Sequence, residues 1–153
     1  MYKIIISPYS KPLRNGQNNP KNYPYWDDLV KGLKEKEMYV IQIGVQGEKK
    51  IDGVDDFKCN LPLKELGKLL KECHTFICVD NFFQHLAYVH EKPGIVIFGQ
   101  SDPEIFGHKG NTNLLKDRKY LRALQFDIWE RCEYSKECFV EPNVIIDSIS
   151  KGV

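Results

Sequence analysis

The sequence predicts a single α/β domain built on a doubly wound, mostly parallel sheet of the nucleotide-binding kind. A chain of 153 residues is long enough for one domain with one hydrophobic core, but not for two such domains. Short apolar runs alternate along the chain with amphipathic helical segments. Strands that are apolar on both faces and alternate with helices are typical of a parallel sheet covered on both sides. We therefore expect residues 1–153 to form one Rossmann-like domain.

Five apolar runs are predicted to be the strands of this sheet. They lie at residues 2–7, 38–44, 57–59, 75–80 and 93–99. The run at 57–59 is weak, whereas the run at 75–80 is continuously apolar and ends in Asp80.

Four helices are predicted, at residues 26–37, 62–73, 81–92 and 142–152. Asp27 and Asp28 suit the positive N-terminal end of the first helix, and Pro62 suits the first turn of the second. The apolar faces of these two helices consist of Trp26, Leu29, Val30 and Leu33, and of Leu63, Leu66, Leu69 and Leu70. Between Gly99 and the last helix the pattern weakens, and the short pieces at 111–115 and 120–126 receive no assignment.

Composition excludes several classes of protein. With 22 Lys and Arg against 21 Asp and Glu, the chain lacks the basic excess of proteins that hold nucleic acid by bulk charge. No segment approaches the ~20 apolar residues of a membrane span, and the start lacks the anatomy of a signal peptide. The five cysteines are scattered among apolar neighbours, which indicates reduced thiols and a cytoplasmic location.

Four loops leave the carboxyl ends of the predicted strands, at residues 7–24, 44–50, 80–85 and 98–110. In open parallel sheets, ligands bind beyond these ends, where neighbouring connections diverge. Each loop by itself is better interpreted as a solvated turn than as part of a ligand site. Because unusual residues gather in all four, we expect a ligand site at this edge.

Residues 80–85 combine a carboxylate at a strand end with a helix that starts at once. Free N–H groups and the positive dipole at a helix N-terminus favour an anion such as phosphate. His85 falls on the same side of the helix as Asn81 and is a candidate donor to a phosphate oxygen. In the alternative interpretation, Asp80 caps the helix and His85 is a satisfied core residue.

The loop after Ser7 is rich in cations and amides. Lys11, Arg14 and Lys21 suit a polyanionic or sugar ligand, although a flexible surface loop is an equally good interpretation. Aromatic residues on either side of the loop are candidates for stacking on a base or sugar, with Trp26 better placed in the core: Tyr9, Tyr23, Tyr25 and Trp26.

The chain resembles glycosyltransferase family 9, the heptosyltransferases and their relatives. The family's C-terminal domain carries Asp-Thr-Gly-x-x-His-Leu-Ala after a strand, then a strand that ends in Phe-Gly-x-x-x-Pro. The matching runs here are 80–87 and 98–103. Residues 21–24 with Trp26 match the family's Lys-x-Trp-Pro segment, and 44–48 resemble its loop of glycine and acid. The resemblance covers residues 2–115 in consistent order.

This resemblance implies a GT-B fold of two domains and an inverting, metal-independent transfer of a sugar from a nucleoside diphosphate. Lys21, Asp80 and His85 then carry the catalytic roles. Lys21 would neutralise the diphosphate, Asp80 would orient donor hydroxyls or support the loop, and His85 would lie beside the phosphates. Glu48 would contact the nucleoside, at its ribose hydroxyls. The ligand-binding set is expected to be Ser7, Arg14, Lys21, Gly44, Glu48, Asp80, Asn81, Phe82, His85, Gly99 and Ser101.

No cofactor or metal is expected. No cluster has metal-ligand spacing, and Cys132 and Cys138 are better read as structural residues. Asn81 and Phe82 replace the family's Thr-Gly, so that an aromatic ring either blocks a phosphate or faces a base or sugar.

The family's acceptor-binding N-terminal domain, which supplies the general base, has no counterpart in the sequence. A homo-oligomer or a partner chain is therefore expected to complete the site. Asp102, Glu104 and His108 lie in a suitable loop, but charged loop residues are usually solvated. Two other functions stay open: a non-catalytic binder of a nucleotide, nucleotide sugar or related signalling molecule, and a structural domain with a decayed pocket.

Overall fold

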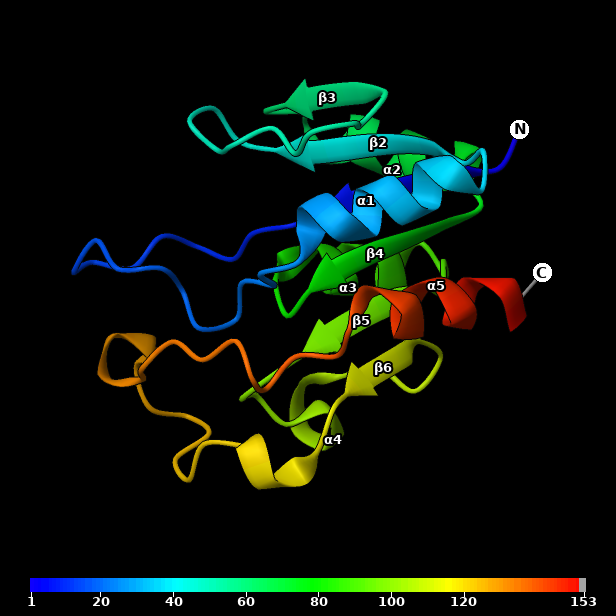
Figure 1. The fold of residues 1–153 in the computed structure, drawn as a ribbon. Coiled ribbons are helices and arrows are strands. Elements are labelled where there is room, and N and C mark those ends of the chain that lie inside the picture. Colours follow the sequence, from blue (N-terminus) through cyan, green and yellow to red (C-terminus); the bar gives the residue numbers. More distant parts are fainter. Residues whose placement is uncertain (152–153) are drawn as a thin grey trace.

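A computed structural model describes residues 1–151, and the side chains up to residue 149. Its centre is a six-stranded sheet in the order β3-β2-β1-β4-β5-β6, in which every neighbouring pair is parallel (Figure 1). The strands are β1 (Lys3–Ser7), β2 (Tyr39–Gly44), β3 (Asp56–Cys59), β4 (Thr75–Val79), β5 (Ile95–Phe98) and β6 (Thr112–Leu115). The predicted doubly wound sheet is confirmed. It has one strand more than expected, because the short piece at 111–115 pairs with β5.

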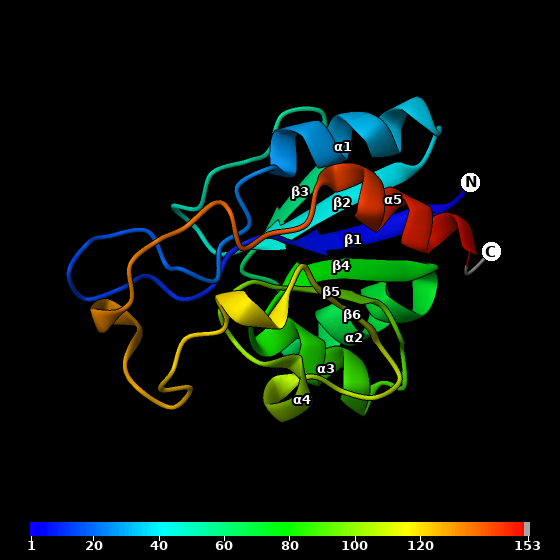
Figure 2. The same cartoon turned by 60° about the horizontal axis from the view of Figure 1, so that its bottom comes forward.

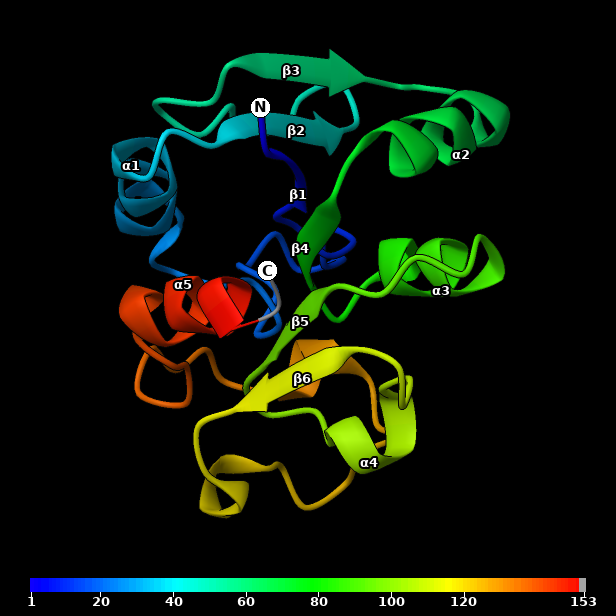
Figure 3. The ribbon, with the colours of Figure 1, turned by 90° about the vertical axis from the view of Figure 1, so that its right-hand side faces the viewer.

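Helices cover both faces of the sheet. α1 (Trp26–Glu35) and α5 (Pro142–Lys151) lie together on one face, and α2 (Leu63–Glu72) and α3 (Phe82–Val89) on the other (Figure 3). α4 (Pro103–Phe106) is a single turn beside β6. It begins where the Asp102 carboxylate accepts from the Glu104 N–H at 2.9 Å, a cap followed at once by proline.

The central strand explains why its apolar run shows no alternation. Ile4 and Ile6 pack against α1 and α5, Ile5 packs against α2 and α3, and none of the three is exposed. Successive side chains of a strand point to opposite faces, and here both faces are covered.

The helices end earlier than the sequence pattern suggests. α1 stops at Glu35 and α3 at Val89, and each is followed by a residue with positive φ, Glu37 (61°) and Glu91 (56°). Such a left-handed residue ends a helix and turns the chain toward the next strand. The last helix runs to Lys151, and the predicted end at Gly152 lies outside the described residues.

Residues 116–141 form the long connection from β6 to α5. They contain two short 3-10 turns, Arg118–Tyr120 and Trp129–Arg131, and run along the carboxyl edge of the sheet beside the loop that follows β1 (Figure 2). The two segments are tied together because the Tyr134 hydroxyl donates to the Asn22 carbonyl at 2.7 Å. The Tyr23 hydroxyl likewise donates to the Val140 carbonyl at 2.8 Å.

Candidate functional site

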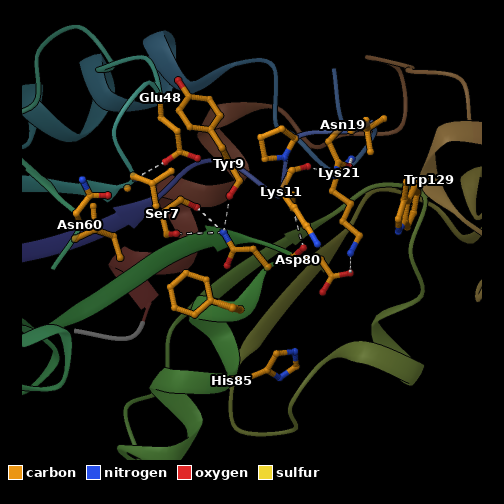
Figure 4. A pocket seen from close by; sticks show the side chains of 18 of the residues that line it. Ser7, Tyr9, Lys11, Asn19, Lys21, Glu48, Asn60, Asp80, His85 and Trp129 are labelled. Carbon is orange, nitrogen blue, oxygen red and sulfur yellow. Dashed lines mark hydrogen bonds and ion pairs between the residues drawn. The ribbon is translucent and has the colours of Figure 1, made fainter. Parts of the chain in front are cut away.

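The pocket lies where the connections from two neighbouring strands diverge. β1 and β4 pair side by side, yet the helix that follows β1 covers one face and the helix that follows β4 covers the other. A pocket of about 870 Å³ opens at this point, beyond the carboxyl ends of the strands (Figure 4). Nine predicted ligand-binding residues line it: Ser7, Arg14, Lys21, Gly44, Glu48, Asp80, Asn81, Phe82 and His85.

Lys21 and Asp80 form the charged centre of the pocket. The Lys21 ammonium lies 3.3 Å from Asp80 Oδ2, and the two side chains are 22% and 8% exposed. The same carboxylate accepts from Gln84 Nε2 at 2.7 Å and from the Ser101 hydroxyl at 3.0 Å. Gln84 and Ser101 fix the orientation of the Asp80 carboxylate, and this carboxylate in turn holds the Lys21 ammonium at the pocket wall.

The helix cap belongs to Asn81, not to Asp80. The Asn81 side-chain oxygen accepts from the Phe83 N–H at 3.0 Å, so the alternative in which Asp80 caps α3 is wrong. The Asn81 amide nitrogen donates to Ser7 Oγ and to the Tyr9 carbonyl, each at 3.1 Å. One side chain thus joins the end of β1, the following loop and the start of α3.

Phe82 and His85 both face the pocket from α3. Phe82 is 55% exposed, so a hydrophobic ring stands where the family has glycine. His85 is exposed, which excludes the alternative that it is a core residue. Its Nδ1 lies 2.8 Å from Nε2 of His108, which does not itself line the pocket.

Glu48 and Gly44 form the wall next to β2. The Glu48 carboxylate folds back to accept from the Val45 N–H at 2.8 Å. It occupies the space that a Cβ at Gly44 would need, so glycine permits this close turn. Tyr9 lies beside Glu48 (Figure 4) and donates to the Lys49 carbonyl at 2.9 Å; burial, with the nearby Glu48 charge, raises the pKa of Tyr9 to about 12.

The other aromatic residues around the loop do not line the pocket. Tyr23 and Trp26 are each 3% exposed, and Trp26 Nε1 donates to the Pro8 carbonyl at 3.2 Å. Tyr25 packs edge-on against Tyr23. Of the stacking candidates, the structure places Tyr9 at the pocket.

Gly99 and Ser101 lie behind the pocket rather than on its wall. A Cβ at Gly99 would come within 2.7 Å of the Phe139 ring and 2.8 Å of Cys138 Sγ. Ser101 is buried and reaches the pocket only through its hydrogen bond to Asp80. Both follow β5, which is one strand farther from β1 than β4 is.

Trp129 and Glu130 line the pocket but were not predicted from the sequence. The Lys21 ammonium lies 5.1 Å from the centre of the Trp129 ring, and the Arg122 guanidinium lies 3.5 Å from it. The Glu130 carboxylate accepts from the Arg14 N–H at 3.0 Å, and this hydrogen bond lowers the pKa of Glu130. The long connection therefore holds in place the loop after β1, which carries Arg14 and Lys21.

Cations outnumber the carboxylates that line the pocket. Lys58 and Lys11 join Arg14 and Lys21, against Glu48, Asp80 and Glu130, each of which accepts a hydrogen bond from the chain itself. The arrangement suits an anion in contact with the loop after β1.

Within residues 1–151 the cysteines are unpaired and no metal-binding cluster of side chains is found. All five cysteines are free thiols, and burial raises the pKa of Cys138 to about 11. Cys132 donates toward Gln100 Oε1 at 3.3 Å and Cys138 toward the Ser135 carbonyl at 3.2 Å. No group of three or more His, Cys, Asp or Glu side chains comes together there in a way that would hold a metal ion. Within the same residues, no helix is long and apolar enough to cross a membrane.

Three solved structures with a similar fold are heptosyltransferases. E. coli ADP-heptose LPS heptosyltransferase II matches with a TM-score of 0.68 and 13% identity, over 98% of this chain and 46% of that one. E. coli heptosyltransferase WaaC with ADP matches with a TM-score of 0.67 and 16% identity, over 99% and 44%. TibC from enterotoxigenic E. coli, a dodecameric iron-containing heptosyltransferase in complex with ADP-D-beta-D-heptose, matches with a TM-score of 0.61 and 18% identity, over 92% and 36%.

The chain thus spans less than half the length of these three proteins and has the fold of one half of a GT-B heptosyltransferase. No curated protein matches its sequence. The model of glycosyltransferase family 9 (heptosyltransferase) matches residues 13–141, which include much of the loop after β1, most of the pocket lining and the whole of the long connection. The chain belongs to glycosyltransferase family 9.

Proposed function

We propose that residues 1–153 are a donor-binding domain of the C-terminal GT-B kind, whose pocket takes a nucleoside diphosphate sugar. The observation that carries this proposal is the Lys21 ammonium, held at the pocket by Asp80 and Trp129 within a loop that also presents Lys11 and Arg14. Family membership supports it. Since WaaC was solved with ADP and TibC with ADP-heptose, ADP-heptose is the first donor to try.

Sugar transfer leaves a nucleoside diphosphate that gains negative charge as the glycosidic bond breaks. Lys21 and His85 are the catalytic residues that stabilise this charge, because preorganised donors act most strongly where charge develops. Asp80 positions Lys21 for this task. Glu48 and Phe82 contact the nucleoside or the sugar from the two sides of the pocket.

The acceptor and its general base are expected to come from outside residues 1–153, for example from a partner chain or a second copy. The three carboxylates that line the pocket are Glu48, Asp80 and Glu130, and each already accepts hydrogen bonds within the chain. Each is thus already used to hold the structure of the pocket, and we do not assign any of them as the base that deprotonates an acceptor hydroxyl.

The same observation favours a second candidate function, a non-catalytic binder of a nucleotide or nucleotide sugar. The two functions differ in turnover. Incubated with ADP-heptose, with and without cell lysate as the source of partner and acceptor, a transferase releases ADP above the lysate background. A binder protects the sugar nucleotide and releases none.

Calorimetric titration and thermal melting with ADP, ADP-heptose and adenosine test the pocket itself. At a ligand concentration of 100 times Kd, binding stabilises the folded chain by about 2.7 kcal/mol, which raises Tm by about 5–10 °C. Lys21→Met keeps the apolar stem, removes the charge, and should abolish the ADP response while the chain stays folded.

Lys34→Met is the matched control. Lys34 also pairs with a carboxylate, Asp55 at 2.6 Å, but lies on α1 and does not line the pocket. This variant should lose some stability and keep the full response to ADP. No response of the unaltered chain to any of the three ligands would refute the donor pocket.

A further inference from the structure

Two histidines from different segments meet at the rim of the pocket. His85 lies on α3, and His108 lies in the loop between α4 and β6. Nδ1 of His85 is 2.8 Å from Nε2 of His108, within the range of a hydrogen bond between nitrogen atoms. The two rings stand nearly perpendicular, at 82°. This contact fixes which ring edge of His85 is left for a ligand.

His108 is held on its other side by an aromatic ring. It stacks on Tyr88 of α3, with 4.1 Å between ring centres and 8° between the planes. Burial, with the nearby charge of His85, lowers the pKa of His108. His108 is partly buried and does not line the pocket, whereas His85 does. The imidazole of His108 therefore acts on the pocket only through His85.

A hydrogen bond between two neutral imidazoles requires one donor and one acceptor, which leaves two arrangements. In the first, His108 donates from Nε2 and His85 carries its own proton on Nε2. In the second, His85 donates from Nδ1, and its Nε2 is a bare lone pair. Since Nδ1 of His85 is turned to His108, Nε2 is the nitrogen available to the pocket.

The intrinsic stability of the tautomers favours the first arrangement. It gives both rings the Nε2–H tautomer, which is the more stable form of a free imidazole side chain. A bound anion would favour it further, because it presents an N–H donor in a pocket where the cations Lys11, Arg14 and Lys21 suit such a ligand. The second arrangement would point a lone pair at that anion.

We propose that His108 is a positioning residue that holds His85 as its Nε2–H tautomer, so that His85 donates to a phosphate oxygen of the bound diphosphate. The role rests on the donor pocket proposed above. His85 touches the ligand, whereas His108 acts through the tautomer and orientation of His85, as partners of a functional histidine commonly do.

Nitrogen-15 NMR of the imidazole rings reads the tautomer directly, without any ligand. His74 provides an internal reference, because its Nδ1 accepts from the Lys3 N–H at 3.0 Å and it must therefore carry Nε2–H. At a pH where both rings are neutral, His85 should show the same Nε2–H pattern as His74. A bare Nε2 on His85 would overturn the proposal.

Substitutions at His108 test the consequence for binding. His108→Phe keeps a ring to stack on Tyr88 but removes the donor, and should weaken ADP binding by about three- to tenfold without changing the affinity for adenosine. His108→Gln retains an N–H donor and should keep most of the affinity. His74→Gln, at the opposite edge of the sheet, is the control and should bind ADP as the unaltered chain does.

The results of these binding experiments distinguish a failure of the His108 role from a failure of the donor pocket itself. Failure of the unaltered chain to bind ADP would overturn the donor pocket and this role together. Normal ADP binding by the unaltered chain, with equal affinity in His108→Phe, would overturn the positioning role alone. Weakening in His108→Phe and His108→Gln alike would assign His108 a packing function and would also overturn it.

Discussion

Gly99 illustrates how one residue can match a binding motif and still serve packing. The sequence places it at the end of β5, within the run that resembles the family's Phe-Gly-x-x-x-Pro. In the structure, the Phe139 ring and Cys138 Sγ occupy the space around its Cα, on the side away from the pocket. The glycine lets the long connection close against β5, which supports the pocket from behind.

Substitution of Gly99 separates the two roles. Gly99→Ala should destabilise the fold by about 1–3 kcal/mol, because the added methyl group overpacks a closed site. The folded variant should bind ADP as the unaltered chain does. Urea denaturation, followed by calorimetric titration at a temperature where the variant is folded, measures both quantities.

Gly110→Ala is the control for this experiment. A Cβ at Gly110 meets nothing within 4 Å, so its unfolding free energy should hardly change. If Gly99→Ala were as stable as Gly110→Ala but bound ADP poorly, Gly99 would be a ligand contact after all.

At the scale of elements, the start of α3 organises the pocket. Asn81 caps the helix and at the same time donates to Ser7 and Tyr9, so the orientation of α3 depends on the end of β1. Phe82 and His85 follow within the first turn and are thereby aimed at the pocket. Loss of the Asn81 side chain should therefore lower both the stability of the fold and the affinity for ADP.

Asn81→Ala should cost about 1–2 kcal/mol of stability, the usual penalty for a lost N-cap, and should also weaken ADP binding. Asn81→Ser restores an oxygen for the Phe83 N–H but lacks the amide donors to β1 and its loop. It should recover most of the stability and only part of the affinity. Melting curves with and without ADP distinguish these effects; full affinity in Asn81→Ala would contradict the proposed organisation.

The elements that the sequence predicts are those with a repeating physical signal. Leu29, Val30 and Leu33 recur at helical spacing and are all fully buried on α1. β6 and α4 lack such a signal: the four residues of β6 contain Asn113 between partly exposed neighbours, and α4 is a single turn. These short elements are stabilised by pairing and capping within the folded chain, which the local pattern does not record.

The same distinction holds for the pocket. Lys21, Glu48, Asp80 and His85 were predictable because each follows a strand, and parallel strands bring their carboxyl ends to one edge. Trp129 comes from a connection without periodicity, and its place depends on tertiary contacts such as that of Tyr134 with Asn22. No residue spacing in the sequence predicts that this connection runs back to the pocket.

At the scale of the whole molecule, stability depends on pH through ion pairs between distant segments. Arg118, in the long connection, donates to both oxygens of Asp102 after β5, at 3.0 and 2.7 Å. This hydrogen bonding lowers the pKa of Asp102 from its ordinary value of 3.8. A carboxyl group with a lowered pKa in the folded state stabilises the protein above its ordinary pKa and loses that contribution as the pH falls.

Arg118→Met should therefore be less stable than the unaltered chain at pH 7, and this difference should shrink as the pH falls below about 4. Urea denaturation of both proteins at pH 7, 5 and 3 measures the difference. A constant difference across this range would mean that Arg118 contributes by packing and not by its bond to the ionised carboxylate.

The place of α5 has a consequence for the chain as it emerges from the ribosome. The apolar face that Ile4 and Ile6 help to form is made before α5, which follows every other described element and packs so closely on α1 that Ile146 occupies the space beside Gly32. A nascent chain therefore carries uncovered apolar surface until translation has passed Lys151 and α5 can pack. Chaperones and proteases can act on this surface during that interval. A stop codon before α5 would leave the surface uncovered permanently.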